Sequence, residues 1–185
     1  MPQAALWGRW QGQIAKLKGV RTVGIARSEE KCLRLVDELG YDLAINRRSA
    51  EGLDSAIASA CPDGAYIYFD SVGGSMLEAA LASLAGGARI IRCGAITSYG
   101  TTEAVPDPGN LFELVTKEAT MQGFMCHFRH QRYDEARQHL GEWIQSGQLK
   151  AIECQLDGIE NAAKVLCNMF EGKNFGKTLI KVFMG

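Results

Sequence analysis

The chain has 185 residues, a length typical of one domain that can bury a full core. Hydrophobic residues make up 46% and charged residues 22% of the sequence, and these ordinary proportions exclude a disordered chain. The formal net charge of -1 gives no electrostatic reason to expect a nucleic acid or an anionic membrane surface as a partner, and no apolar run reaches membrane-spanning length.

The six cysteines are scattered along the chain, without a C-x-x-C pair and without cysteine and histidine grouped nearby. This spacing does not fit a structural zinc site, so we expect no bound metal and reduced thiols that are mostly buried. The N-terminus lacks the cationic and then apolar pattern of a secretory signal, which predicts a cytoplasmic protein.

The first half of the chain alternates short apolar runs with segments whose apolar residues have helical spacing. We expect strands over residues 20–26, 42–46, 65–70 and 88–93, and helices over residues 11–18, 29–39 and 53–60. Gly19, Gly40 and Gly64 follow these helices as C-terminal stops. The alternation predicts right-handed crossovers and an α/β fold with a doubly wound, mainly parallel sheet.

After residue 93 the pattern loosens into a long polar loop that contains Pro106 and Pro108. Beyond it we expect a helix over residues 110–117, a strand over 120–128, helices over 133–146 and 160–171, and a last strand over 177–183. Ligands of doubly wound sheets bind outside the carboxyl ends of the strands, so the segments that follow the strands are the candidates for a site.

The segment VRTVGIARSEEK ends a strand at Ala26 and begins a helix that Ser28 caps. Units that bind NAD place an acidic residue at the end of this strand, where it binds the ribose hydroxyls. Here Arg27, Ser28 and Lys31 stand in that neighbourhood, and cations with a hydroxyl suit a 2'-phosphate. The pattern favours NADP(H) over NAD, and the alternative is a surface turn with an ordinary helix cap.

Two further strands end in glycine and small polar residues. The segment YIYFDSVGGSMLEAAL places Ser71 and the pair Gly73-Gly74 after its strand, which suits the close approach of a ligand and equally a plain tight turn. The segment ARIIRCGAITSY ends in a similar way, and its Tyr99 is a candidate donor of a proton or a hydrogen bond, or else a packed loop residue. Backbone groups at these strand ends suit a ribose or a nicotinamide.

The chain contains, in this order, the motifs GQIAKLKG, GIARSEEK, ACPDGAYIYFDSVGG, RIIRCGAI, MQGF and NFGKTLIKV. From about Gly12 to the C-terminus it resembles the Rossmann-like, cofactor-binding half of the zinc-independent medium-chain dehydrogenase/reductases, in the branch of the leukotriene/prostaglandin reductases and 2-alkenal reductases. The resemblance implies an oxidoreductase that uses NADPH to deliver hydride to the β-carbon of an α,β-unsaturated aldehyde or ketone. It also implies that hydrogen bonding stabilises the resulting enolate.

The resemblance further implies cofactor contacts at particular positions. Lys31 matches a lysine that pairs with the 2'-phosphate, and Asn174 of NFGK matches an asparagine that reaches the cofactor. The positions that match segments lining the nicotinamide and its ribose are Cys93, Gly94, Ala95, Ile96, Thr97, Ser98, Tyr99, Phe124, Met125 and Cys126.

The sequence departs from the family at three positions near these contacts. The family reads FDNVGG where this chain has Ser71, and Arg47, which also suits a phosphate, stands for a tyrosine near the adenosine phosphate. Thr116 stands for a tyrosine that relatives place near the substrate, and this departure weakens the catalytic assignment, for which Tyr99 is the candidate.

We expect residues 1–11 to be an altered or truncated segment ahead of an NADP-binding domain over residues 12–185. Where the family has a strand that runs into AASGAVG, this chain reads MPQAALWGRWQ, a pattern typical of an altered or frame-shifted start. We expect the family's N-terminal catalytic domain to be absent, and the first strand and the glycine-rich phosphate loop to be missing or altered. Loss of this central strand leaves an unpaired edge or a gap in the sheet, which a homodimer or a swapped strand would cover.

Two functions follow from these patterns. The first is the NADP(H)-binding domain of an enone or alkenal reductase, which is not active without a substrate domain. The second is a non-catalytic remnant or interaction module that associates through an exposed sheet edge. A methyltransferase is disfavoured, because the sequence lacks a glycine-rich first loop followed by an acidic residue at the end of the second strand.

Overall fold

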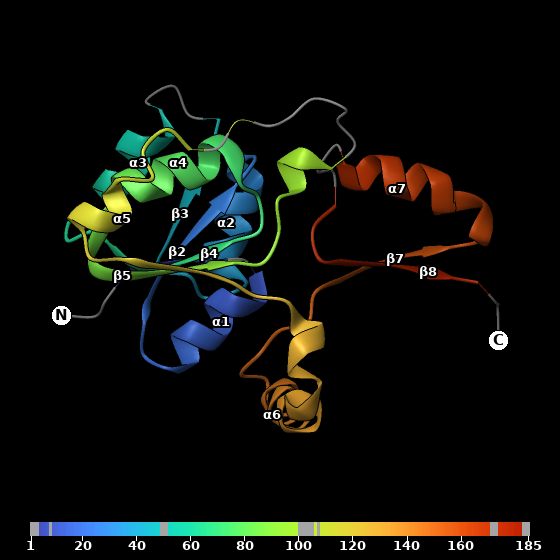
Figure 1. Cartoon of the computed structure of the whole chain (residues 1–185). Helices are drawn as coiled ribbons and strands as arrows, with labels where there is room; N and C mark the ends of the chain where they lie inside the picture. Colours follow the sequence, from blue (N-terminus) through green and yellow to red (C-terminus); the bar gives the residue numbers. More distant parts are fainter. Residues whose placement is uncertain are drawn as a thin grey trace. The chain divides into compact units, whose positions relative to one another are not determined.

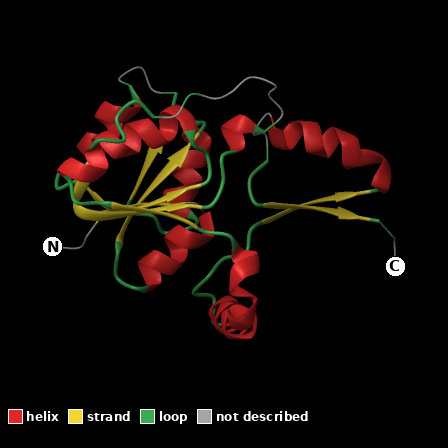
Figure 2. Ribbon diagram, viewed as in Figure 1, coloured by secondary structure: helices red, strands yellow, loops and turns green. Residues whose placement is uncertain are grey.

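The computed structural model of the chain describes residues 4–7, 9–48, 52–99, 106, 108–170 and 174–182. The chain divides into two compact units, Met1–Ala136 and Arg137–Gly185, whose elements are drawn in Figure 1 and Figure 2. Within the described residues, no helix combines the length and the apolar character needed to cross a membrane.

The first unit contains, in chain order, β1 (Ala4–Trp7), α1 (Arg9–Leu17), β2 (Arg21–Ala26), α2 (Glu29–Asp37), β3 (Leu43–Asn46), α3 (Leu53–Ala60), β4 (Ala65–Asp70), α4 (Gly74–Ala82), β5 (Leu84–Arg92), the 3-10 helix η1 (Ile96–Ser98), α5 (Glu113–Thr116), β6 (Thr120–Gly123) and the 3-10 helix η2 (Cys126–Arg132). Helix α6 (Tyr133–Gln145) begins at the end of this unit and continues into the second. The second unit then contains β7 (Glu153–Asp157), the 3-10 helix η3 (Ile159–Asn161), α7 (Ala162–Phe170) and β8 (Lys177–Lys181).

The first unit is built on a six-stranded sheet with the order β3-β2-β1-β4-β5-β6. Every neighbouring pair in it is parallel. The chain winds outward from β1 to β3, returns to β4 beside β1, and winds outward again to β6, so the strand order reverses between β1 and β4. The predicted doubly wound α/β fold is confirmed.

The expected loss of the central strand is wrong. Strand β1 pairs with β2 along all four of its residues, from Ala4 opposite Arg21 to Trp7 opposite Gly24. It also pairs with β4, although the register shifts between Ala4 and Ala5. Four apolar residues suffice because a central parallel strand is hydrogen-bonded on both sides. The sheet has no gap at its centre, and the proposed association through an unpaired central edge loses its structural basis.

Helices cover both faces of this sheet (Figure 1). Side chains alternate along β2, so Val23 packs in the core with Ile57 of α3 and Leu77 of α4. On the opposite face the backbone at Gly24 lies against Leu35 of α2. Helices α3 and α4 therefore cover one face, and α2 covers the other.

Several predicted boundaries move in the structure. Strand β6 ends at Gly123, opposite Arg92, because β5 ends there and offers no further partner. The strand predicted over residues 120–128 therefore turns into η2 after its fourth residue. The helix predicted over residues 110–117 is the single turn α5, which is followed by Glu118 at a positive φ of 49°.

The last predicted strand does not join the main sheet. Strand β8 pairs in parallel with β7 in a separate two-stranded sheet, in a register that places Glu153 opposite Lys177 and Asp157 opposite Lys181. Strand β7 was not predicted, although ECQLD alternates polar and apolar residues, a pattern that indicates a half-buried strand. Opposite charges at both ends of the pairing favour this register.

Gly64, between α3 and β4, lies in close contact with the backbone at the start of β5. Its φ is +80°, and a Cβ there would lie 2.5 Å from the backbone nitrogen of Ala85. We expect Gly64→Ala to lower the free energy of unfolding in urea by about 2 kcal/mol or more, because the backbone itself must shift. At Gly86 a Cβ would meet nothing within 4 Å, so Gly86→Ala is the control, with a change within about 0.5 kcal/mol. Equal losses in the two variants would contradict this account.

Candidate functional site

The carboxyl ends of the parallel strands form the edge of the sheet where a ligand is expected. Doubly wound sheets bind ligands in the crevice at the point where the strand order reverses, which here lies between β1 and β4. The segments that leave this edge are the turns after β2, β3 and β4 and the long connection after β5. These are the segments that the sequence marked as candidates.

A cavity of about 320 Å³ opens among these segments. The residues that line it are Arg27, Arg47, Arg48, Leu53, Val72, Gly73, Ser75, Met76 and Thr97. Burial, with the positive charges of Arg27 and Arg48, lowers the pKa of the Arg47 guanidinium. The three cations repel one another, and an anion bound among them would relieve this repulsion. No residue of this lining in the described chain is acidic.

The turn between β2 and α2 carries the predicted residues Arg27, Ser28 and Lys31. Ser28 caps α2, and its Oγ accepts a hydrogen bond of 3.4 Å from the backbone N–H of Lys31. Glu29 and Glu30 lie in the first turn of α2, where the helix dipole favours negative charge. Of the three predicted residues, Arg27 alone lines the cavity.

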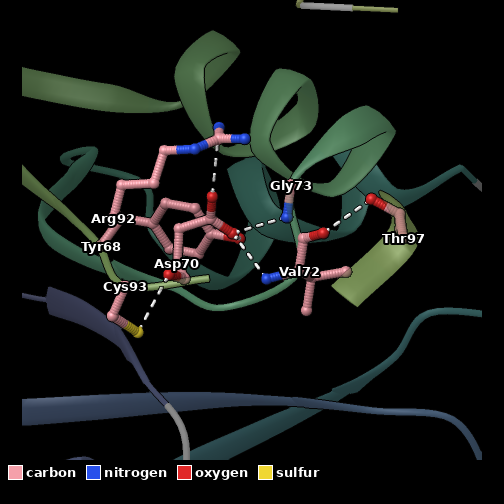
Figure 3. A network of polar contacts seen from close by, with 7 residues as sticks. All are labelled: Tyr68, Asp70, Val72, Gly73, Arg92, Cys93 and Thr97. Atoms are coloured by element: carbon pink, nitrogen blue, oxygen red, sulfur yellow. Dashed lines mark hydrogen bonds and ion pairs between the residues drawn. The ribbon is translucent and has the colours of Figure 1, made fainter. Parts of the chain in front are cut away.

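Asp70 organises the turn between β4 and α4 (Figure 3). Its side chain is 0% exposed, and its Oδ1 accepts hydrogen bonds from the amides of Val72 at 3.0 Å and Gly73 at 2.9 Å. The hydroxyl of Tyr68 donates to the same oxygen at 3.3 Å. The other oxygen, Oδ2, forms an ion pair at 3.5 Å with Nη1 of Arg92, the last residue of β5.

The segment after β5 rests on this turn. The amides of Ile96 and Thr97 donate to the carbonyl oxygens of Ser71 and Val72, at 3.1 and 3.2 Å. The Thr97 hydroxyl donates to the Val72 carbonyl at 2.7 Å. The structure therefore brings together the predicted residues Ser71, Ile96 and Thr97. Tyr99 is 60% exposed, and its hydroxyl oxygen lies 3.6 Å from the position of a Cβ on Gly94.

Cys93 follows β5 and is hydrogen-bonded to the end of β4. Its thiol donates to the carbonyl oxygen of Asp70 at 3.2 Å. Burial, together with the Asp70 carboxylate, raises the pKa of the Cys93 thiol. Burial and the same carboxylate raise the pKa of Tyr68 far above its ordinary value. Neither group is suited to act as a nucleophile or base near neutral pH.

The remaining predicted residues lie on other segments. Phe124, Met125 and Cys126 follow β6 and are exposed, and the amide of Phe124 donates to the carbonyl oxygen of Arg92 at 2.8 Å. Asn174 belongs to the second unit, where its Nδ2 donates to Gly176 O at 3.4 Å and to Thr178 Oγ1 at 3.3 Å. Contact of these residues with a cofactor stays a prediction.

The connection between β1 and α1 is unusually short. Strand β1 ends at Trp7 and α1 begins at Arg9, so a single position, Gly8, stands where a glycine-rich loop was sought. Gly8 lies outside the described residues. The start of α1 is packed closely, since a Cβ on Gly12 would lie 1.8 Å from the hydroxyl oxygen of Tyr41.

The sequence pattern of the zinc-binding dehydrogenase family matches residues 8–142. The chain belongs to this family. It is 38% identical over 181 residues to the NADPH-dependent curcumin reductase of Escherichia coli, an alignment that covers 95% of this chain and 52% of that protein. It is 35% identical over 175 residues to the NADP(+)-dependent 2-alkenal reductase of Nicotiana tabacum, covering 95% of this chain and 51% of that protein. The chain thus spans about half the length of these relatives.

Its structure is similar to the crystal structure of CurA from Vibrio vulnificus in complex with NADPH, with a TM-score of 0.91 and 34% identity. The comparison covers 100% of this chain and 58% of CurA. The resemblance to the cofactor-binding half of the zinc-independent medium-chain dehydrogenase/reductases, in the branch of the prostaglandin and 2-alkenal reductases, is confirmed. The residues that the structure describes contain no group of three or more His, Cys, Asp or Glu side chains that could hold a metal ion.

Sequence reasoning found part of the cavity lining. Arg27, Arg47 and Thr97 were predicted, and Arg48, which follows Arg47 directly after a predicted strand, was missed. The contact between Asp70 and Arg92 was also missed. An acidic residue at the end of an apolar run was the available signal for Asp70, whereas its partner on the next strand is found only from the fold.

Two substitutions of Ser28 test its role as the N-cap of α2. We expect Ser28→Ala to lower the free energy of unfolding by about 1 kcal/mol, because the first turn of α2 loses an acceptor for the Lys31 amide. Ser28→Asp keeps a capping oxygen and should retain the stability of the native chain, as measured by urea unfolding. A loss of the same size in both variants would show that capping is not what Ser28 contributes.

Proposed function

We propose that the carboxyl edge of the main sheet binds NADP(H), with the 2'-phosphate held among Arg27, Arg47 and Arg48. The observation that carries this proposal is the cavity that these three guanidinium groups line without an acidic residue. NAD-binding sheets place a carboxylate at the end of the second strand to bind both ribose hydroxyls. Here that strand ends at Ala26 and is followed by Arg27. The guanidinium of Arg27 attracts a phosphate, and it has no acceptor atom for the ribose hydroxyls.

The pyrophosphate has a less usual environment. A glycine-rich loop offers a row of backbone amides to the pyrophosphate, whereas the sequence has a single position between the bounds of β1 and α1. The first amides of α1 and the positive end of its helix dipole would contribute to binding the pyrophosphate. In this proposal the arginines therefore carry a larger share of the binding free energy than the glycine loop does in an ordinary dinucleotide site.

We further propose that the cofactor serves the reduction of the C=C bond of an α,β-unsaturated aldehyde or ketone. The curcumin reductase and the 2-alkenal reductase among the relatives support this substrate class. The reduced nicotinamide, when bound, supplies a hydride. The segment from Cys93 to Ser98 would line the nicotinamide with backbone groups, and the exposed hydroxyl of Tyr99 would donate a hydrogen bond to the substrate oxygen, where negative charge develops.

The choice of cofactor is tested by titrating the chain with NADPH and with NADH. We expect Arg47→Ala to weaken NADPH binding roughly 10- to 100-fold, because one charge-assisted contact to a phosphate contributes roughly 1.5–3 kcal/mol. Binding of NADH should change little, since it lacks the 2'-phosphate. Cofactor fluorescence provides the measurement.

Arg89→Ala is the matched control, because it removes an exposed arginine of β5 that does not line the cavity. This variant should leave both affinities unchanged. If Arg47→Ala weakens NADPH and NADH equally, or if Arg89→Ala matches it, the arginines do not select the 2'-phosphate. If the native chain binds neither cofactor, the hypothesis of a non-catalytic relic is the better one.

The reaction is tested in a chimera in which this chain replaces the matching half of the Escherichia coli curcumin reductase. With NADPH and an enone, we expect the saturated ketone as product, identified by NMR. Tyr99→Phe should slow turnover about tenfold or more, because the hydrogen bond to the developing oxyanion is lost. An allylic alcohol as the product would instead show reduction of the carbonyl group and would contradict the proposed substrate chemistry.

A further inference from the structure

The carboxylate of Asp70 is fully buried at the edge of the sheet that faces the cofactor cavity. A carboxylate at 0% exposure is destabilising unless donors and an opposite charge surround it. Oδ1 has three donors, two of them backbone amides, whereas Oδ2 has no hydrogen-bond partner and faces Arg92 at 3.5 Å. The two oxygens therefore have separate partners, and Figure 3 shows a dashed line from one oxygen to Arg92 and dashed lines from the other to Val72 and Gly73.

Oδ1 fixes the turn that forms one wall of the cavity. The amides it binds belong to Val72 and Gly73, and both of these residues line the cavity. Gly73 has a φ of +74°. Glycine adopts positive and negative φ values about equally readily, so contacts such as those of Oδ1 are needed to hold one conformation of the turn. Asp70 itself is not among the lining residues, so its influence on a ligand is transmitted through this turn.

The same turn holds the segment after β5. Carbonyl oxygens of Ser71 and Val72 accept the amides of Ile96 and Thr97, and Val72 also accepts the Thr97 hydroxyl. Thr97 reaches the cavity from this second segment. A chain of hydrogen bonds thus leads from one carboxylate to two loops that come from different strands.

Arg92 closes this arrangement from β5. Its side chain is 31% exposed, and Nη2 lies 3.1 Å from the position of a Cβ on Gly73. The ion pair with Asp70 holds this guanidinium over the turn and away from the cavity lining. Arg92 therefore neutralises the buried carboxylate without adding a fourth cation to the anion site.

We propose that Asp70 is a positioning residue for the cofactor, whose buried carboxylate fixes the β4–α4 turn and, through it, the segment Ile96–Ser98 beside the arginine-lined cavity. This inference rests on the proposed binding of NADP(H) at that edge. Asp70 does not contact the ligand. It sets the spacing between the arginines, which hold the 2'-phosphate, and the backbone segment assigned to the nicotinamide side.

The test compares the whole cofactor with a fragment that needs only the arginines. Asp70→Asn removes the charge that pairs with Arg92 and places an N–H group against this guanidinium, so we expect the side chain to lose its fixed position against the amides of Val72 and Gly73. We expect roughly tenfold weaker binding of NADPH and less than about threefold weaker binding of adenosine 2',5'-bisphosphate. Asp63→Asn, an exposed aspartate that does not line this cavity, is the control and should change neither affinity.

Arg92 supplies a second pair of variants in case Asp70→Asn folds poorly. Arg92→Met should reproduce the unequal loss of the two affinities, and Arg92→Lys, which retains the charge, should restore NADPH binding. A residue that only stabilises the fold would lower the melting temperature and leave both affinities of the folded protein unchanged, or reduce them equally. Either of these results would overturn the proposal.

Hydrogen exchange separates failure of this proposal from failure of the proposed function. In Asp70→Asn the amides of Ile96 and Thr97 should exchange at least about tenfold faster than in the native chain, while the amides of β2 keep their protection. If the native chain binds neither NADPH nor the fragment, the proposed function fails, and this measurement still decides whether Asp70 positions the segment. Unchanged exchange at Ile96 and Thr97 would overturn the positioning role.

Discussion

The pairing of β1 with both of its neighbours is the constraint on which the rest of the first unit depends. Ala4–Trp7 lies between β2 and β4 and is hydrogen-bonded to each. Because all six strands are parallel, this pairing aligns their carboxyl ends along one edge, where the turns after β2, β3 and β4 meet. The arginines, the Asp70 turn and the segment after β5 come from four different strands, and only the intact sheet brings them together.

Charge at this edge is distributed in an unusual way for a dinucleotide-binding sheet. The connection between β1 and α1 is reduced to one position, whereas the ends of β2 and β3 contribute three arginines to one cavity. The backbone amides of a glycine loop bind phosphate because their N–H groups point at it, whereas guanidinium groups bind it through their charge and their paired N–H donors. A site of this kind distinguishes ligands by the number and position of their phosphates more than by the shape of the dinucleotide.

The alternation of apolar runs and helical spacing predicted most of the first unit, and helix α3 and strand β4 have the predicted bounds. The prediction failed where local pattern and tertiary pairing disagree. The residues AALW are too few to signal a strand by themselves, and they become one only because β2 and β4 offer partners on both sides. Likewise β8 looks like a strand of the main sheet, but it pairs with β7 in a separate two-stranded sheet.

At the site, single residues beside strand ends could be predicted, because cations and a cap after an apolar run are visible in the sequence. Contacts between segments could not. Arg92 lies 22 residues after Asp70, and the sequence around neither residue predicts the ion pair that forms between them. The register places Asp70 directly opposite Arg92, so the pair is a property of strand pairing and of no local motif.

The close contact between Gly12 and Tyr41 has a consequence for protein engineering. Contacts within α1 hold the helix in position, since Gly12 leaves room for the Tyr41 hydroxyl, and Lys16 forms an ion pair with Asp42, just before β3. The helix is therefore anchored independently of the chain that leads into it. A redesign of the chain ahead of α1 would leave both contacts in place, because Gly12 and Lys16 lie within the helix.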